Sequence, residues 1–258
     1  MYRTSLFTSI IVLAACLTVA DRAQAVIIYS QDWAAGIAGQ SILAAPYNFT
    51  GNPGGVFLVQ ATTPLGPDLA VAATSAVDGG GSTGVATVPI TGPSGAPGTK
   101  YILTAKMFAP AGGNDSWIGL ADPTVNGGQS FNNAGAYIGM SSGNWRIDGR
   151  GIRGGDDAAI LHIGAGGQLT DVAVDVKIEL DIDTNTALFS VTDGVTTLSH
   201  SFVGGNTFSA LSRLAIQQFT TGIAIDDVLV QEIPEPSSIL LLGFGGLAGL
   251  VTWRRRRN

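Results

Sequence analysis

The stretch from Val172 to Ile182 reads V-A-V-D-V-K-I-E-L-D-I, with Val, Ile or Leu at every second position. Side chains of a β-strand point alternately to opposite faces, so this period of two predicts a strand with one apolar face and one face in water. Turn residues follow from Asp183 to Thr186, the chain returns from Ala187 to Thr192, and Asp193-Gly194 turns it again. The stretch therefore predicts a β-hairpin buried on one side.

Short apolar runs separated by Gly, Asn, Asp and Pro continue on both sides of this hairpin. This pattern predicts an all-β chain in which two antiparallel sheets stack as a jelly-roll sandwich, in one domain from Val26 to Glu232. The other strands are expected at Val26 to Tyr29, Gly55 to Gln60, Val85 to Ile90, Tyr101 to Phe108, Trp117 to Ala121, Ala136 to Met140, Trp145 to Asp148, Leu198 to Phe202, Arg213 to Phe219 and Ile223 to Gln231.

The first 25 residues have the organisation of a secretory signal peptide. Arg3 gives a positive start, Leu6 to Ala20 form an apolar core, and Ala23-Gln24-Ala25 is a small-x-small cleavage site. A signal peptidase is expected to cut after Ala25 and leave Val26 as the first residue. The chain is thus predicted to be exported.

A second interpretation of this segment stays open. Leu13-Ala14-Ala15-Cys16 is similar to a lipobox, in which Cys16 would become the lipidated first residue. Cys16 is the only cysteine, so cleavage after Ala25 would leave a protein that can form no disulfide.

The C-terminus, from Ile233 to Asn258, contains three elements in order: I-P-E-P-S-S, an apolar run from Ile239 to Trp253, and the arginines Arg254, Arg255, Arg256 and Arg257. As a helix the run covers roughly 22 Å, which makes a thin transmembrane span. Arginine at a membrane edge stays on the cytoplasmic side, so the four arginines predict a cytoplasmic stop.

These elements resemble the PEP-CTERM sorting signal of exported bacterial proteins, although Ile233 stands where valine is commoner. The resemblance implies that Pro234, Glu235 and Pro236 are recognised by an exosortase-type membrane peptidase, which removes the helix and the arginines. It also implies delivery to the envelope surface or its polysaccharide matrix. The two prolines fix φ and hold the peptide extended, a form that a peptidase can bind. The alternative is a plain membrane anchor that is never cut.

The body of the chain resembles the concanavalin A-like and laminin G-like sandwiches. The similar features are Gln31-Asp32-Trp33 after the first strand, the strand Trp117-Ile118-Gly119-Leu120, the hairpin around Asp183 to Thr186, and the closing strand Ile225 to Val230. In such folds the first and last strands often pair, which would place the sorting tail beside the N-terminus.

Charge excludes one class of partner. Of 13 basic and 19 acidic residues, six arginines and two acids lie in the terminal segments, which leaves 7 basic and 17 acidic residues and a net charge of −10 from Val26 to Pro234. This charge repels phosphate backbones, so no nucleic-acid partner is expected.

One motif suggests catalysis. Glu179-Leu180-Asp181-Ile182-Asp183 is similar to the E-x-D-x-E strand of jelly-roll glycoside hydrolases, but Asp183 replaces the last glutamate. A retaining enzyme needs carboxyls about 5 to 5.5 Å apart, whereas four residues of strand separate the backbones by about 13 Å. Glu179 and Asp181 are interpreted as solvent-facing residues of a half-buried strand. The protein is predicted not to be an enzyme.

Metal and cofactor sites are weakly indicated. Asp181-x-Asp183-x-Asn185 begins like an EF-hand loop, but Thr186 and Thr192 replace the glycine and glutamate of that loop. His162 and His200 lie far apart, with no cysteine to join them in a zinc site. No cofactor is predicted; a structural calcium ion, held by Asp226, Asp227 or Asp156-Asp157 and loop carbonyls, stays open.

Aromatic residues near the middle of the chain suggest a glycan site. Trp117 and Trp145, with Tyr137, Phe131 and neighbouring asparagines, could line one face, and nearby arginines would suit acidic sugars. The alternative is that the two tryptophans belong to the core. The sequence therefore predicts a non-enzymatic, structural or adhesive envelope or matrix protein, with a glycan-binding module of the extracellular polysaccharide as the second hypothesis.

Overall fold

The computed structural model describes most of the predicted sandwich and neither end of the chain. The described residues are 25–34, 36–38, 40–43, 45–51, 57–60, 63, 65, 70–73, 84–95, 98–112, 116–123, 135–149, 160–164, 166–203, 211–218 and 224–234.

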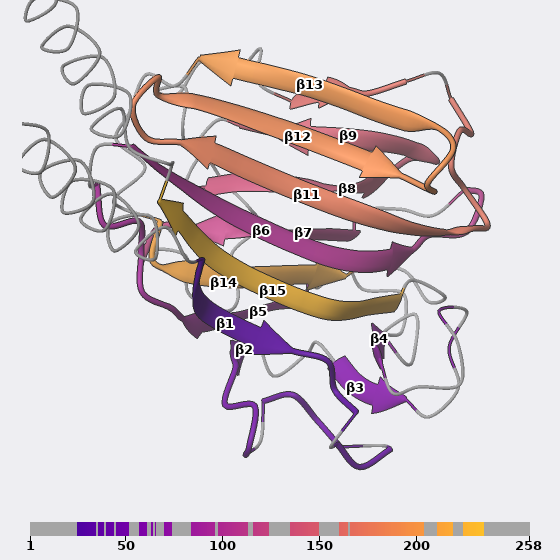
Figure 1. Cartoon of the computed structure of the whole chain (residues 1–258). Helices are drawn as coiled ribbons and strands as arrows, with labels where there is room; N and C mark the ends of the chain where they lie inside the picture. Colours follow the sequence, from indigo (N-terminus) through magenta and orange to yellow (C-terminus); the bar gives the residue numbers. More distant parts are fainter. Residues whose placement is uncertain are drawn as a thin grey trace, which may run out of the picture.

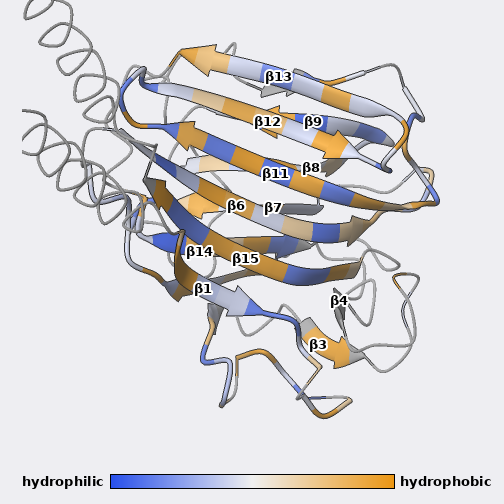
Figure 2. Ribbon diagram, viewed as in Figure 1, coloured by the Kyte–Doolittle hydropathy of each residue, from blue (hydrophilic) through white to orange (hydrophobic). Residues whose placement is uncertain are grey.

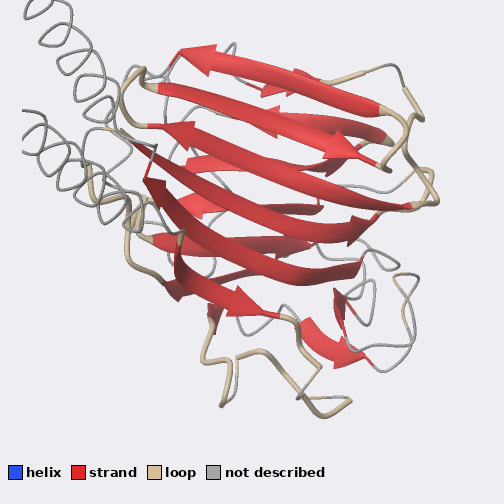
Figure 3. Ribbon diagram, in the orientation of Figure 1, coloured by secondary structure: helices blue, strands red, loops and turns tan. Residues whose placement is uncertain are grey.

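Within these residues the chain forms strands and loops but no helix, and the strands make two stacked antiparallel sheets (Figures 1 and 3). Sheet A has eight strands: β13 (Thr197–Val203), β12 (Thr186–Thr192), β11 (Ala173–Asp181), β6 (Thr99–Phe108), β15 (Ala224–Pro234), β4 (Ala70–Ala73) and β3 (Phe57–Gln60) in that order, with β1 (Val26–Gln31) also paired to β15. Sheet B has seven: β10 (Ile160–His162), β9 (Asn144–Asp148), β8 (Gly135–Ser141), β7 (Ser116–Ala121), β14 (Arg213–Gln218), β5 (Gly84–Pro89) and β2 (Thr50–Gly51).

The predicted hairpin is the pair β11–β12, with Asp181 opposite Thr186 and Asp175 opposite Thr192. Residues of β11 alternate in exposure as the sequence predicts: Ile178 and Leu180 are fully buried, whereas Lys177 and Glu179 face out of the sheet. On its other side β11 pairs with β6, so this hairpin is built into the middle of sheet A.

The prediction of an all-β, two-sheet sandwich is confirmed, and all twelve expected strands are present within a few residues of their expected bounds. Sequence patterns missed β2, β4 and β10, which have two, four and three residues and are too short to show a period. The last strand was expected to stop at Gln231, but β15 continues to Pro234 because β6 still offers pairing partners there.

The core lies between the two sheets. Hydrophobic and hydrophilic residues alternate along strands such as β11 (Figure 2). Burial of apolar surface at about 25 cal/mol per Å² is the main favourable contribution to folding. The largest fully buried side chains are Trp33, Trp145, Tyr101, Tyr137, Phe189, Ile42, Leu103, Met107, Ile118, Leu120 and Ile138.

Candidate functional site

The last strand of the sandwich leads without a break into the predicted sorting signal. In β15, Glu232 pairs with Tyr101, Ile233 with Lys100 and Pro234 with Thr99. Figure 1 shows this strand lying between β6 and β1. Pro234 is therefore the end of a paired strand, while Glu235, Pro236 and Arg254–Arg257 lie outside the described residues.

The start of the predicted mature chain lies beside the C-terminal end of β15. Val26, the first residue of β1, is the register partner of Glu232, and Ala25 just before it is exposed. The expectation that the first and last strands pair is thus confirmed, although Ala23 lies outside the described residues. The expected signal-peptide cut and the expected sorting cut meet at one corner of sheet A, here called the β1–β15 corner.

Glu232 is held at this corner by the loop that precedes β6. Its Oε1 accepts hydrogen bonds from the backbone N–H of Ser94, at 3.2 Å, and from the Ser94 hydroxyl. Beside it, the buried Tyr101 hydroxyl donates to the Thr91 carbonyl. Burial, together with the Glu232 charge, raises the pKa of Tyr101, so this phenol stays protonated and keeps donating. The sequence gives no signal for the Ser94–Glu232 contact, which joins residues far apart in the chain.

The outer face of sheet A carries a groove of about 510 Å³ that is lined by both polar and apolar residues. Its side chains come from neighbouring strands in register: Asp175 lies opposite both Thr192 and Lys106, and Lys177 lies opposite both Ser190 and Thr104. Nothing in the sequence analysis singled this groove out. The groove could have been predicted from three of the expected strands, because the alternation of side chains along each strand places these residues on one face.

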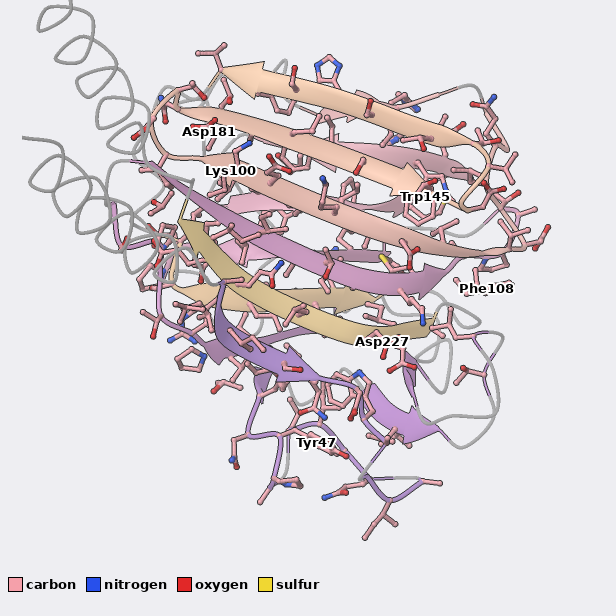
Figure 4. The ribbon with its side chains drawn as sticks, viewed as in Figure 1. Tyr47, Lys100, Phe108, Trp145, Asp181 and Asp227 are labelled. Carbon is pink, nitrogen blue, oxygen red and sulfur yellow. The ribbon has the colours of Figure 1, made fainter. Side chains whose placement is uncertain are left out.

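A β-bulge in β15 supplies one wall of the groove. The register shifts between Asp226 and Leu229, and Asp227 adopts a positive φ of 48°. The bulge lets Asp227 reach Lys106, with Oδ2 2.6 Å from Nζ; Figure 4 labels Asp227 near the start of β15. This ion pair, followed by the charges of Asp175 and Asp226, raises the pKa of Lys106, so the lysine stays charged.

Asp226 itself is nearly buried, with 8% of its surface exposed. Burial raises its pKa to about 6, even though its Oδ1 accepts the Asp227 N–H at 2.8 Å. Among the described residues no group of three or more metal-ligating side chains comes together. Asp156 and Asp157, the other candidates for calcium, lie outside that part of the chain.

The three carboxylates of the glycosidase-like motif do not converge on a cleft. Glu179 makes ion pairs with Lys100 and Lys177, each at 3.0 Å. Figure 4 labels Lys100 and Asp181 near the C-terminal end of β11. Desolvation works against the charged form of Glu179, but the hydrogen bonds from both lysines prevail and its pKa is lowered. Asp181 caps the turn by accepting the Thr184 N–H at 3.0 Å, and Asp183 accepts the Gly98 N–H at 2.7 Å.

The two tryptophans of the expected glycan site lie on opposite sides of sheet B, contrary to the expectation that they share one face. Trp145 is in the core, 1% exposed, and its indole N–H donates to the Leu169 carbonyl at 3.1 Å. Trp117 points away from the core, where it packs with Tyr137, and it is 7% exposed. Neither indole offers the exposed ring that stacking on a sugar requires, because both are covered by other parts of the chain.

The described residues contain no membrane-spanning helix, and the apolar run from Ile239 to Trp253 lies outside them. The membrane span therefore stays a prediction.

Comparison with known proteins gives one family match and many distant structural likenesses. A family model described as the PEP-CTERM protein-sorting motif matches residues 232–257. No curated protein matches the chain.

Solved structures with a similar arrangement include the globular domain of T. cruzi calreticulin, at a TM-score of 0.49 and 9% identity, covering 90% of this chain and 100% of that one. A lectin from Bauhinia forficata in complex with GalNAc matches at a TM-score of 0.46 and 9% identity, over 82% of this chain and 99% of that one. A sialidase matches at 0.48 and 9% identity over 79% of this chain, which spans only 18% of the sialidase's length. Residues 232–257 are a PEP-CTERM sorting motif, and the chain is an exported protein that is sorted through the membrane.

Proposed function

We propose that this protein is a non-enzymatic structural or adhesive component of the cell envelope or extracellular matrix. A signal peptidase removes residues 1–25. An exosortase-type membrane peptidase recognises Pro234, Glu235 and Pro236 and removes the helix and the arginines that follow them. The segment from Ile239 to Trp253 holds the precursor in the membrane, with Arg254 to Arg257 on the cytoplasmic side. The observation that carries this proposal is that the matched motif begins inside β15, the last strand of the sandwich, so cleavage releases an intact folded domain.

The arrangement of polar groups supports a role without catalysis. Glu179 is tied to two lysines, and Asp181 and Asp183 each accept a backbone N–H. The lowered pKa of Glu179 keeps this carboxylate charged, whereas a glycosidase needs one carboxyl that keeps its proton. The net charge of the mature chain suits solubility and repulsion from anionic lipid.

The test is fractionation of the producing bacterium. Wild-type protein is compared with a variant that carries Pro234→Ala, Glu235→Ala and Pro236→Ala, and each is followed by immunoblot in inner membrane, outer envelope and medium. We expect the wild type in the envelope or medium and the variant in the inner membrane as a longer precursor. Identical distribution of the two proteins would refute sorting through this motif.

A second candidate function is glycan binding in the groove of sheet A. The groove is lined by hydroxyl and charged side chains together with Ala105 and Val176, and Lys106 is already paired with Asp227. Hydroxyls and paired charges of both signs suit a neutral polysaccharide better than an acidic one.

Matrix polysaccharide from the same bacterium provides the ligand for this second test. Ser190→Tyr would fill the groove, whereas Ser201→Tyr adds the same side chain at an exposed position of β13 that does not line it. Loss of binding in the first variant alone would support the groove. Equal binding by both variants, or no binding by the wild type, would remove this candidate.

A further inference from the structure

β15 is the strand on which sheet A depends for completion. It pairs with β6 along one edge and with β1 and β4 along the other. The register partners found for β1 among the described residues all belong to β15. Among the described strands, β6 therefore has an unpaired edge and β1 has no partner until β15 is in place.

The pairing extends into the matched motif. Glu232, Ile233 and Pro234 lie opposite Tyr101, Lys100 and Thr99, and Glu232 also lies opposite Val26 of β1. These three motif residues are thus part of a strand that has neighbours on both sides at Glu232.

A side-chain contact adds to the backbone pairing. The Ser94 hydroxyl and N–H both donate to the Glu232 carboxylate, which fixes the strand end to the loop before β6. Hydrogen bonds to a charged acceptor are stronger than those between neutral groups. The N-terminal side of the sorting motif is therefore held by backbone and side-chain contacts together.

A peptidase that reads an extended substrate uses the same backbone N–H and C=O groups that a β-sheet uses. Each group can serve the sheet or the enzyme, but not both with good geometry. Only four residues separate Pro234 from Ile239, so the chain between them spans at most about 18 Å. The motif has no slack with which to leave the sandwich while β15 stays paired.

We propose that docking of β15 between β1 and β6 regulates cleavage at the sorting motif, so that the membrane peptidase acts on the folded precursor only after Glu232, Ile233 and Pro234 peel away from the sheet. This inference rests on the proposed function, since it concerns the same cleavage. The partner is the sorting peptidase, and the β1–β15 corner is where it engages the precursor.

The geometry also orders the two cuts. In the described part of the chain β1 pairs only with β15, the last strand there, so the signal peptidase meets Ala25 next to a strand that is unpaired until β15 has been exported. The sorting peptidase meets a motif that the completed sheet already holds. On this proposal, N-terminal cleavage is expected first, and release from the membrane is expected after the fold is complete.

The test measures the rate of C-terminal cleavage by pulse-chase in the producing bacterium, with the full chain. A flexible Gly/Ser linker of about six residues, inserted between Gln231 and Glu232, leaves the matched residues 232–257 contiguous and frees them from the sheet. Ser94→Ala removes the hydroxyl that donates to Glu232 and leaves the motif unchanged. Asp193→Ala is the control, because it removes hydrogen bonds from Val195 and Thr196 in the β12–β13 turn, away from β15.

We expect the linker to raise the cleavage rate by about tenfold or more and Ser94→Ala to raise it about fivefold, while the control matches the wild type. Faster cleavage in the control as well would mean that general loss of stability, rather than the β1–β15 corner, sets the rate, and would overturn the proposal. The proposal would also be overturned if the linker variant and Ser94→Ala were cleaved at rates equal to or below that of the wild type. A wild type that is never cleaved would instead refute the proposed function, which keeps the two failures distinct.

Discussion

Adjacent residues of β11 are expected to respond in opposite ways to truncation, because alternation places them on opposite faces of sheet A. Ile178 is fully buried between the sheets, whereas Lys177 is on the outer face with 38% of its side chain exposed. Ile178→Ala removes buried methyl and methylene groups and leaves a cavity, which costs about 2 to 5 kcal/mol. Lys177→Ala removes an ion pair to Glu179 that is partly in water, which costs at most about 1 kcal/mol.

Urea unfolding of a soluble chain that ends before Ile239, followed by tryptophan fluorescence, measures both changes. For a typical slope of about 2 to 3 kcal/mol per molar urea, a loss of about 3 kcal/mol lowers the midpoint by roughly 1 M or more. Lys177→Ala should shift the midpoint by less than about 0.5 M. Equal shifts, or the larger shift in Lys177→Ala, would refute the assigned facing of β11 and with it the sandwich core.

Two further changes test the fold locally. Burial raises the pKa of Asp226 to about 6, so the folded protein holds this proton more tightly than the unfolded chain does, and the free energy of unfolding falls as pH rises from about 4 to about 6. Asp226→Asn should remove this fall and raise Tm at pH 7.5. An unchanged Tm at that pH in thermal scans would argue against a cost of burying the Asp226 charge. A Cβ at Gly119 would lie 2.2 Å from the Ala136 carbonyl oxygen and 2.3 Å from Tyr137 Cδ1; Gly119→Ala should therefore cost about 1 to 3 kcal/mol in urea unfolding, and a cost near zero would contradict the close packing of β7 on β8.

Strand positions were predictable where apolar residues alternate over five residues or more. The sequence around Ile178 predicts which residues are buried and where the chain turns, because one side of sheet A faces the core and the other faces solvent. Sheet B is different, since β7 and β8 are buried on both faces. Their residues give no alternation in exposure, but they were still predicted as strands because they form short apolar runs between turn residues.

The site was predictable only in part. The sorting motif is local in sequence, so Pro234, Glu235 and Pro236 could be named without a structure. The contact between Ser94 and Glu232 joins two distant segments and follows only from the register of β15 on β6. The choice between a tryptophan-lined glycan face and core tryptophans could not be made from the sequence, because the register of sheet B decides that Trp117 and Trp145 point to opposite sides.

The intact mass of the protein released from wild-type cells tests the central claim most directly, because one number reads both ends of the chain. The account predicts a protein that begins at Val26 and lacks the apolar segment and Arg254 to Arg257. A mass that includes the four arginines would contradict sorting at this motif. A lipidated N-terminus at Cys16 would contradict the predicted cleavage after Ala25, and it would leave the pairing of β1 with β15 unchanged.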